Sequence, residues 1–136
     1  MERILVAFRQ IILLVEDEPL ILNFLRDTFT DAGHAVVVAS NGRSALQELE
    51  TDSDRFGGIV TDIKLGAGPD GWQVGHRARE LSPHIRVVYV SGDCGHDWLA
   101  KGVPDSEMIS KPFAADQIVT AFPPSWFRRG PGGVGG

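Results

Sequence analysis

The sequence predicts an α/β fold: a doubly wound parallel sheet of five strands in the order 2-1-3-4-5, with helices on both faces. Five short runs of apolar and β-branched residues alternate along the chain with segments of helical periodicity. Strands and helices that alternate at this length form a parallel sheet with right-handed crossovers. The predicted order places the first and third strands side by side at the switch point of the sheet.

Length and composition fit one soluble globular domain. Of 136 residues, 43% are hydrophobic and 23% are charged, and no apolar run approaches the roughly 20 residues of a membrane span. A net charge of -5 argues against a nucleic-acid surface, which normally carries a basic stripe. The single cysteine, Cys94, excludes an internal disulfide. With no signal-peptide core at the N-terminus, we expect a cytoplasmic protein that binds neither nucleic acid nor membrane.

The first half of the chain carries three of the strands. Pro19 suits the first turn of a helix, and Gly33 suits the position just after that helix ends. Ser40 or Asn41 is expected to cap the next helix. The elements predicted here are a strand at 11–15, a helix at 19–32, a strand at 35–39, a helix ending near 51, a polar connection at 52–56 and a strand at 58–61.

The second half begins with a glycine-rich loop at 66–71 and carries the other two strands. A helix is stopped by Ser82-Pro83, because the residue before proline disfavours helix. The predicted elements are a helix at 72–81, a strand at 85–90, a short helical segment at 93–102, a strand at 108–110 and a helix at 114–122. The domain is expected to span 11–122, with an N-terminal extension at 1–10 and a flexible Pro/Gly-rich tail at 123–136.

Acidic side chains follow two neighbouring strands at the point where each ends. Glu16 and Asp17 follow the first strand, and Asp62 follows the third. Because the carboxyl ends of parallel strands meet at one edge of a sheet, these carboxylates are expected to share a crevice. Their repulsion is relieved by raised pKa values or by a divalent ion, and all-oxygen ligation favours Mg²⁺. The predicted ligands are Asp17, Asp62, Glu16 either directly or through water, and the backbone carbonyl of Lys64.

The same edge carries groups suited to phosphoryl chemistry. A carboxylate held near Mg²⁺ can attack a phosphoryl group and form an acyl phosphate, and Asp62 is placed for that role. Lys111 and Ser91, at the ends of the fifth and fourth strands, can neutralise phosphoryl oxygens. Gly92 leaves space for the group and exposes a backbone N–H, and Lys64 is expected beside it.

Four segments of the chain resemble the receiver domain of two-component response regulators. They are Val15-Glu-Asp-Glu-Pro19, Val60-Thr-Asp62, Val90-Ser-Gly92 and Ser110-Lys-Pro-Phe113, and the resemblance covers roughly residues 11 to 122. It implies a flavodoxin-like fold and a cis peptide bond at Lys111-Pro112. It also implies Mg²⁺-dependent phosphorylation of Asp62 by a histidine kinase or a histidine phosphotransfer protein, after which Ser91 turns toward the phosphoryl group.

The resemblance also implies how the signal leaves the domain. The fourth helix, fifth strand and fifth helix would form a surface that contacts a downstream protein target and allows a homodimer. The chain would be a phosphoacceptor that catalyses only its own phosphorylation and dephosphorylation. It departs from the family at Gly66, where a proline is usual, and at Met108, where an aromatic residue is common. Lys64 and Asp93 occupy positions that in this family influence the lifetime of the acyl phosphate.

Other interpretations remain at this point. Asp17 and Glu18 suit the start of a helix, where the macrodipole favours acids. The chain is expected to be a stand-alone, single-domain receiver; the alternatives are a receiver excised from a hybrid kinase or a larger regulator, and a pseudo-receiver that binds partners without phosphorylation. A small phosphohydrolase with Asp62 as nucleophile would need a second carboxylate two residues later, where the chain has Lys64.

Overall fold

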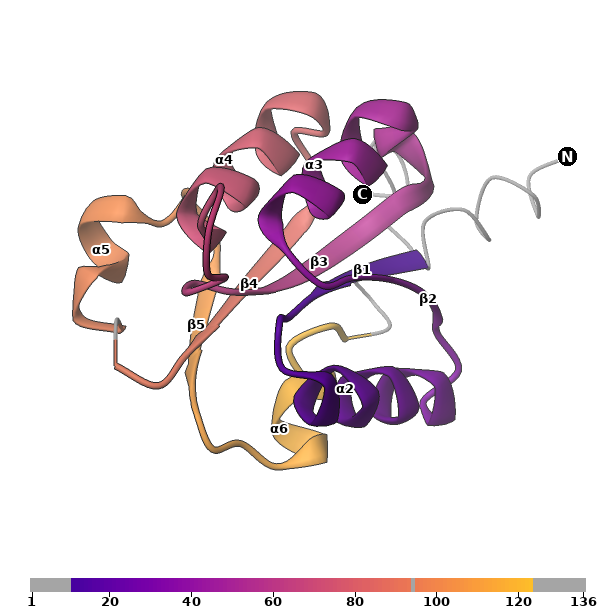
Figure 1. Cartoon of the computed structure of the whole chain (residues 1–136). Coiled ribbons are helices and arrows are strands. Elements are labelled where there is room, and N and C mark those ends of the chain that lie inside the picture. The colour runs from indigo at the N-terminus through magenta and orange to yellow at the C-terminus, as the bar shows by residue number, and fades with distance from the viewer. Residues whose placement is uncertain (1–10, 94, 124–136) are drawn as a thin grey trace, which may run out of the picture.

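The computed structural model describes residues 11–93 and 95–123, and it contains a five-stranded parallel sheet between two layers of helices (Figure 1). The sheet has the order β2-β1-β3-β4-β5, and each neighbouring pair is parallel. The predicted strand order is therefore confirmed. The strands are β1 (Ile11–Val15), β2 (Ala35–Ala39), β3 (Phe56–Asp62), β4 (Arg86–Ser91) and β5 (Glu107–Ser110).

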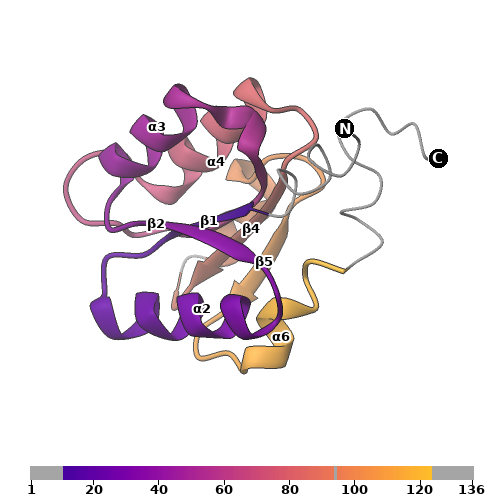
Figure 2. The same ribbon diagram turned by 90° about the vertical axis from the view of Figure 1, so that its right-hand side faces the viewer.

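Helices cover both faces of the sheet. Figure 2 shows α2 and α6 on one face and α3 and α4 on the other. Helix α5 is a single short turn preceded by a 3-10 turn. The helices are α2 (Pro19–Asp31), α3 (Gly42–Thr51), α4 (Gly71–Leu81), α5 (Trp98–Lys101) and α6 (Ala115–Val119), and the 3-10 turns are η1 (Ser53–Arg55) and η2 (Gly95–Asp97).

The central strands β1, β3 and β4 are buried on both faces, which is why they appear in the sequence as nearly continuous apolar runs. Successive residues of β1 alternate between the two cores: Leu13 joins the cluster under α3 and α4, and Leu14 joins the cluster under α2 and α6. Val87 and Val88 of β4 divide in the same way. Burial on both sides fixes the register of every central strand, so the carboxyl ends of the strands meet at one edge.

Side-chain caps set where two helices begin. Asn41 caps α3, because its Oδ1 accepts a hydrogen bond from the Ser44 backbone N–H at 2.8 Å. Asp70 and Gln73 form a capping box at α4, in which each side chain accepts a hydrogen bond from the backbone N–H of the other at 2.9 Å. The sequence left Ser40 and Asn41 open for α3, and the structure selects Asn41. The Asp70 cap places α4 directly after the loop that follows β3.

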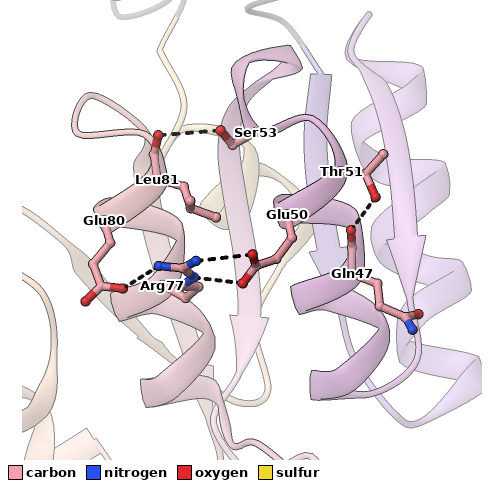
Figure 3. Close-up of polar contacts among 7 residues, drawn as sticks. All are labelled: Gln47, Glu50, Thr51, Ser53, Arg77, Glu80 and Leu81. Carbon is pink, nitrogen blue, oxygen red and sulfur yellow. Dashed lines mark hydrogen bonds and ion pairs between the residues drawn. The ribbon is translucent and has the colours of Figure 1, made fainter.

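Helices α3 and α4 are joined by polar contacts along their exposed sides (Figure 3). The Arg77 guanidinium donates to both carboxylate oxygens of Glu50, at 2.8 and 3.1 Å, and to Glu80 at 3.1 Å. The Ser53 hydroxyl, in η1 just after α3, donates to the carbonyl oxygen of Leu81, the last residue of α4, at 3.4 Å. The two helices therefore cover their face of the sheet as one layer.

Several element boundaries differ from the prediction. The third strand begins at Phe56 instead of Gly58, because the Phe56 ring is buried in the core and its backbone pairs with Ile11. The polar connection predicted at 52–56 therefore ends earlier and contains η1. The last helix is shorter than the predicted 114–122, although Phe122 remains buried and its ring contacts Phe29.

Some predictions concern residues outside the described ranges. The extension at 1–10, Cys94 and the tail from 124 onward are of this kind, so the division of the chain at 10 and 123 stays a prediction. Within the described ranges, every helix is too short or too polar to cross a lipid bilayer.

Candidate functional site

The predicted site residues gather at the carboxyl edge of the sheet. Strands β1, β3, β4 and β5 all end there, and the loops that follow them form the walls of one pocket. The pocket is lined by Asp17, Glu18, Asp62, Lys64, Ser91, Gly92, Asp93 and Lys111. Glu16 does not line this pocket, because its side chain is fully buried.

Three carboxylates form the acidic part of the site. Glu16, Asp17 and Asp62 each have an oxygen within 4.8 Å of the oxygens of the other two. Glu16 and Asp62 are buried, and Asp17 is exposed. β1 and β3 are direct neighbours, with Val15 paired to Thr61, so the acids that follow Val15 and Thr61 come together. In the structure, acids that follow two neighbouring strands therefore lie together, as predicted.

Lys111 supplies the positive charge inside this cluster. Its Nζ lies 2.9 Å from Asp62 Oδ2 and 3.1 Å from Glu16 Oε1. Its backbone N–H donates to the Ser91 carbonyl oxygen at 2.9 Å, and the Lys111-Pro112 peptide bond is cis, as predicted. Burial lowers the pKa of the ammonium, but the contacts with Asp62 and then Glu16 outweigh it and hold the pKa above its ordinary value.

Glu16 is a buried acid of the site with a raised pKa. Its Oε2 accepts a hydrogen bond from the Glu18 backbone N–H at 3.1 Å. Its Oε1 is buried and faces the Lys111 ammonium without an aligned hydrogen bond. Burial, and next the charge of Asp62, raise the pKa of Glu16 from 4.5 to about 7. One oxygen of this buried carboxylate therefore lacks an aligned hydrogen-bond donor.

The donor set fits a hard divalent cation. Its groups are carboxylate oxygens from two strand ends, one of them the incompletely bonded Oε1 of Glu16. Mg²⁺ prefers oxygen ligands, takes one or two carboxylates and retains several waters, which suits a cluster with a solvent-exposed member such as Asp17. The cluster is therefore compatible with Mg²⁺.

The pocket is also lined by residues that stand at or just after the ends of β3 and β4. Ser91 is buried, and its Oγ accepts a hydrogen bond from the Asp93 backbone N–H at 3.2 Å. At Gly92 a Cβ would meet nothing within 4 Å, so the space beside this residue is open. The Lys64 ammonium forms an ion pair with Asp93 at 2.8 Å, and both side chains are about two-thirds exposed.

Two contacts of the site were not predicted from the sequence: the Lys64–Asp93 pair and a contact of 3.8 Å between Glu18 Oε1 and Lys111 Nζ. The Lys64–Asp93 pair has a signal in the sequence: the two residues stand two positions after Asp62 and Ser91, with which the neighbouring strands β3 and β4 end. For the contact between Glu18 and Lys111, the only signal is an acid at the start of α2.

A glycine allows α4 to pack against the end of β3. The Gly71 backbone N–H donates to the Ile63 carbonyl oxygen at 2.7 Å, and a Cβ at Gly71 would lie 2.1 Å from the Asp62 carbonyl oxygen. Gly66 and Gly68, in the loop between them, have φ values of 75° and 92°, which side chains rarely adopt. The glycine-rich loop therefore turns sharply beside the phosphoacceptor candidate.

Comparison with known proteins places this geometry in a family. The family model described as "Response regulator receiver domain" matches residues 12–122. The chain is 29% identical over 110 residues to the response regulator receiver protein CpdR of Brucella abortus, covering 79% of this chain and 89% of that protein. It is 32% identical over 109 residues to the transcriptional activator protein IrlR of Burkholderia pseudomallei, of which it spans 46%.

Solved structures show the same arrangement of strands and helices. A response regulator receiver protein from Sinorhizobium medicae is 40% identical, with a TM-score of 0.81, and the match covers 87% of this chain and 94% of that one. The response regulator TrrA from Thermotoga maritima, solved in complex with Mg²⁺-BeF, has a TM-score of 0.71 at 22% identity, with 82% and 94% covered. The second likeness shows the fold alone.

Proposed function

Because the chain belongs to the family of response regulator receiver domains, we propose that it accepts a phosphoryl group on Asp62 in a Mg²⁺-dependent phosphorelay. The observation that carries the proposal is the convergence on Asp62 of a cation and an acid cluster. The Asp62 carboxylate lies 2.9 Å from the Lys111 ammonium and within 4.8 Å of the other two acids. This is the arrangement that a nucleophilic carboxylate needs in order to approach a negatively charged phosphoryl group.

Each site residue has a distinct role in this proposal. Asp62 attacks phosphorus, so that an O–P bond forms while the bond from phosphorus to a donor histidine nitrogen breaks. Bound Mg²⁺ would supply charge neutralisation between the acids and the phosphoryl oxygens. Lys111 and Ser91 contact the other phosphoryl oxygens, and the open space at Gly92 admits the group. Asp17, Glu16, Asp62 and the Lys64 backbone carbonyl are the proposed positions around the ion.

The proposed partners follow from the family and from exposed surface. A histidine kinase or a histidine phosphotransfer protein would donate the phosphoryl group. Output would pass to a downstream protein through the surface formed by α5, β5 and α6, where Leu99 is 91% exposed. The same surface would serve a homodimer. The chain is a signalling protein of the receiver family, and its only proposed reactions are its own phosphorylation and dephosphorylation.

Mass measurement after treatment with a small phosphodonor tests the proposal. With Mg²⁺ the wild-type chain is expected to gain one phosphoryl group, and without a divalent ion it is expected to gain none. Asp62→Asn should gain none under either condition, because the amide is a poor nucleophile. Asp54→Asn is the matched control, since Asp54 lies on η1 and does not line the pocket. It should be labelled like the wild type.

Three outcomes would contradict the assignment. Equal labelling of Asp62→Asn would place the phosphoacceptor elsewhere. Sustained turnover of a phosphomonoester, in place of a single stable addition, would indicate a hydrolase. A chain that folds and binds Mg²⁺ but accepts no phosphoryl group would be the pseudo-receiver.

Magnesium affinity is expected to depend on pH through Glu16. The pKa of this acid is raised from 4.5 to about 7, so its stabilising effect on the metal-free fold is complete below pH 4.5 and is lost as the pH rises through 7. Mg²⁺ must displace the proton, so its apparent affinity should rise about tenfold between about pH 6 and about pH 8. Calorimetric titration measures this. Glu16→Gln should bind more weakly and without the pH dependence; an unchanged slope would exclude Glu16 as its source.

A further inference from the structure

Glu18 stands at the start of α2 but its side chain does not cap the helix. It is the N-cap residue, in an extended backbone conformation, and its carboxylate accepts no capping hydrogen bond. Serine, threonine, asparagine and aspartate are the usual caps because their short side chains reach the N–H groups of the first turn. Pro19 follows as the first residue of the helix. The capping role therefore does not explain where the Glu18 carboxylate lies.

The carboxylate instead lies at the pocket, beside Lys111. Glu18 lines the pocket together with Asp62 and Lys111, and its Oε1 is 3.8 Å from Lys111 Nζ. The ammonium is thus in contact with three carboxylates of different exposure. The side chains of Glu16 and Asp62 are buried, at 0% and 8% exposed, whereas that of Glu18 is 64% exposed. The backbone of Glu18 meanwhile holds Glu16 through the 3.1 Å hydrogen bond to Oε2.

These contacts set up a competition for one ammonium. Glu16 and Asp62 attract it into the acid cluster, where a divalent cation would also bind, and two cations so close repel each other. Glu18 attracts it toward the exposed side of the pocket. A group that draws the ammonium outward lowers its competition with the metal and leaves it near the path of an incoming anionic group.

We propose that Glu18 is a positioning residue for Lys111. In the metal-free structure the ammonium lies 2.9 and 3.1 Å from Asp62 and Glu16 and 3.8 Å from Glu18. When a cation occupies the acid cluster, the Glu18 carboxylate would hold the ammonium on the exposed side of the pocket, where it meets a phosphoryl oxygen. The part of this inference that concerns the phosphoryl group rests on the proposed function. The part that concerns the ammonium and the metal is testable without any phosphorylation.

A double-mutant cycle on Mg²⁺ affinity tests the inference. Glu18→Gln keeps the shape of the side chain and removes its charge. It is expected to weaken Mg²⁺ binding about two- to fivefold, the range for an exposed ion pair. In a Lys111→Met background the same change should have almost no effect, because there is no ammonium to position. Asp31→Asn, at the other end of α2 and outside the pocket, controls for net charge and should leave the affinity unchanged.

The side-chain resonances of Lys111 give a second readout in the metal-free protein. Glu18→Gln should shift the NMR signal of the Lys111 Cε group, and Asp31→Asn should not. Equal weakening of Mg²⁺ binding in both backgrounds would show that Glu18 acts only as a nearby negative charge, and an unmoved Lys111 signal would overturn the inference. Neither measurement depends on whether Asp62 accepts a phosphoryl group, so failure of the proposed function gives a different result: normal coupling but no labelling.

Discussion

Replacing Lys111 with methionine is expected to destabilise the metal-free protein by about 2 to 3 kcal/mol near neutral pH. The lysine Nζ is the positive partner of Glu16 and Asp62, at 3.1 and 2.9 Å, and both of these carboxylates are buried. Without it, two buried acids face each other with no nearby cation. The expected loss is smaller than for a fully buried ion pair, because the Lys111 side chain is 18% exposed. Methionine retains most of the apolar stem, so packing is largely preserved.

The pH dependence of the stability lost in Lys111→Met identifies the cause of that loss. Lys111 lowers the pKa of Glu16, so removing the ammonium raises that pKa further, and the folded state holds a proton that the unfolded chain has lost. The deficit should be full near pH 8 and should shrink as the pH falls toward the unfolded value of 4.5. Chemical denaturation at several pH values measures it. A deficit that does not change with pH would indicate a packing defect instead.

A divalent ion should partly replace the missing lysine. Mg²⁺ supplies positive charge to the same carboxylates, so saturating Mg²⁺ should raise the stability of Lys111→Met more than that of the wild type. Lys101→Met is the matched control, because Lys101 is 56% exposed and its ion pair with Asp97 spans 3.8 Å. Its effect should stay within about 0.5 kcal/mol. Phosphorylation of Lys111→Met by a small donor should be strongly slowed.

Gly71→Ala is expected to cost about 3 kcal/mol of stability and to disturb the site at the same time. A Cβ at this position would lie 2.1 Å from the Asp62 carbonyl oxygen and 2.6 Å from the Ile63 Cα atom. Both atoms are backbone, so no side chain can rotate away. Alanine favours helices over glycine by about 1 kcal/mol, but this preference is too small to offset the overlap. The helix or the end of β3 must move.

The movement of α4 or of the end of β3 should affect the site as well as the free energy of unfolding. Because the overlap involves the backbone of Asp62, Gly71→Ala should also weaken Mg²⁺ binding in the fraction that remains folded. Gly92→Ala is the matched control for stability, since its added methyl group meets nothing within 4 Å and should change the free energy of unfolding by less than about 0.5 kcal/mol. Thermal denaturation compares the two. A Gly71→Ala variant as stable as the wild type would show that α4 can shift at little cost.

Much of the fold was predictable because its signals are local. Runs such as Ile11–Val15 are apolar along their whole length, and the alternation of such runs with helices predicts a parallel sheet. The order 2-1-3-4-5 is one of two common orders for such a sheet, and the structure has it. The strand ends were predictable for the same reason: Asp62 and Ser91 come where each apolar run stops. Boundaries were less certain. The four residues before Phe56 are polar and predict a connection that includes it. Only the pairing of Phe56 with Ile11 and the burial of its side chain make it part of β3.

The candidate site is likewise predictable in part: the sequence predicts which residues it contains but not all of their contacts. Which residues stand at the carboxyl edge, among them Asp17, Asp62 and Lys111, follows from counting along each strand. The ion-pair partner of the Lys64 side chain cannot be predicted by such counting, because Asp93 is 29 residues away in the chain. The contact between Lys111 and Asp62 spans 49 residues, and its distance depends on how two strands and a loop pack.

By itself, the sequence determined the alternating elements and the set of polar residues at the strand ends, because hydrophobic period and residue spacing are properties of short segments. Only the tertiary structure decided that Glu16 is buried with a pKa near 7, that Glu18 contacts Lys111, and that Gly71 touches the backbone of Asp62. Each of these depends on desolvation or on distances between segments remote in the chain, and those quantities exist only once the chain has packed.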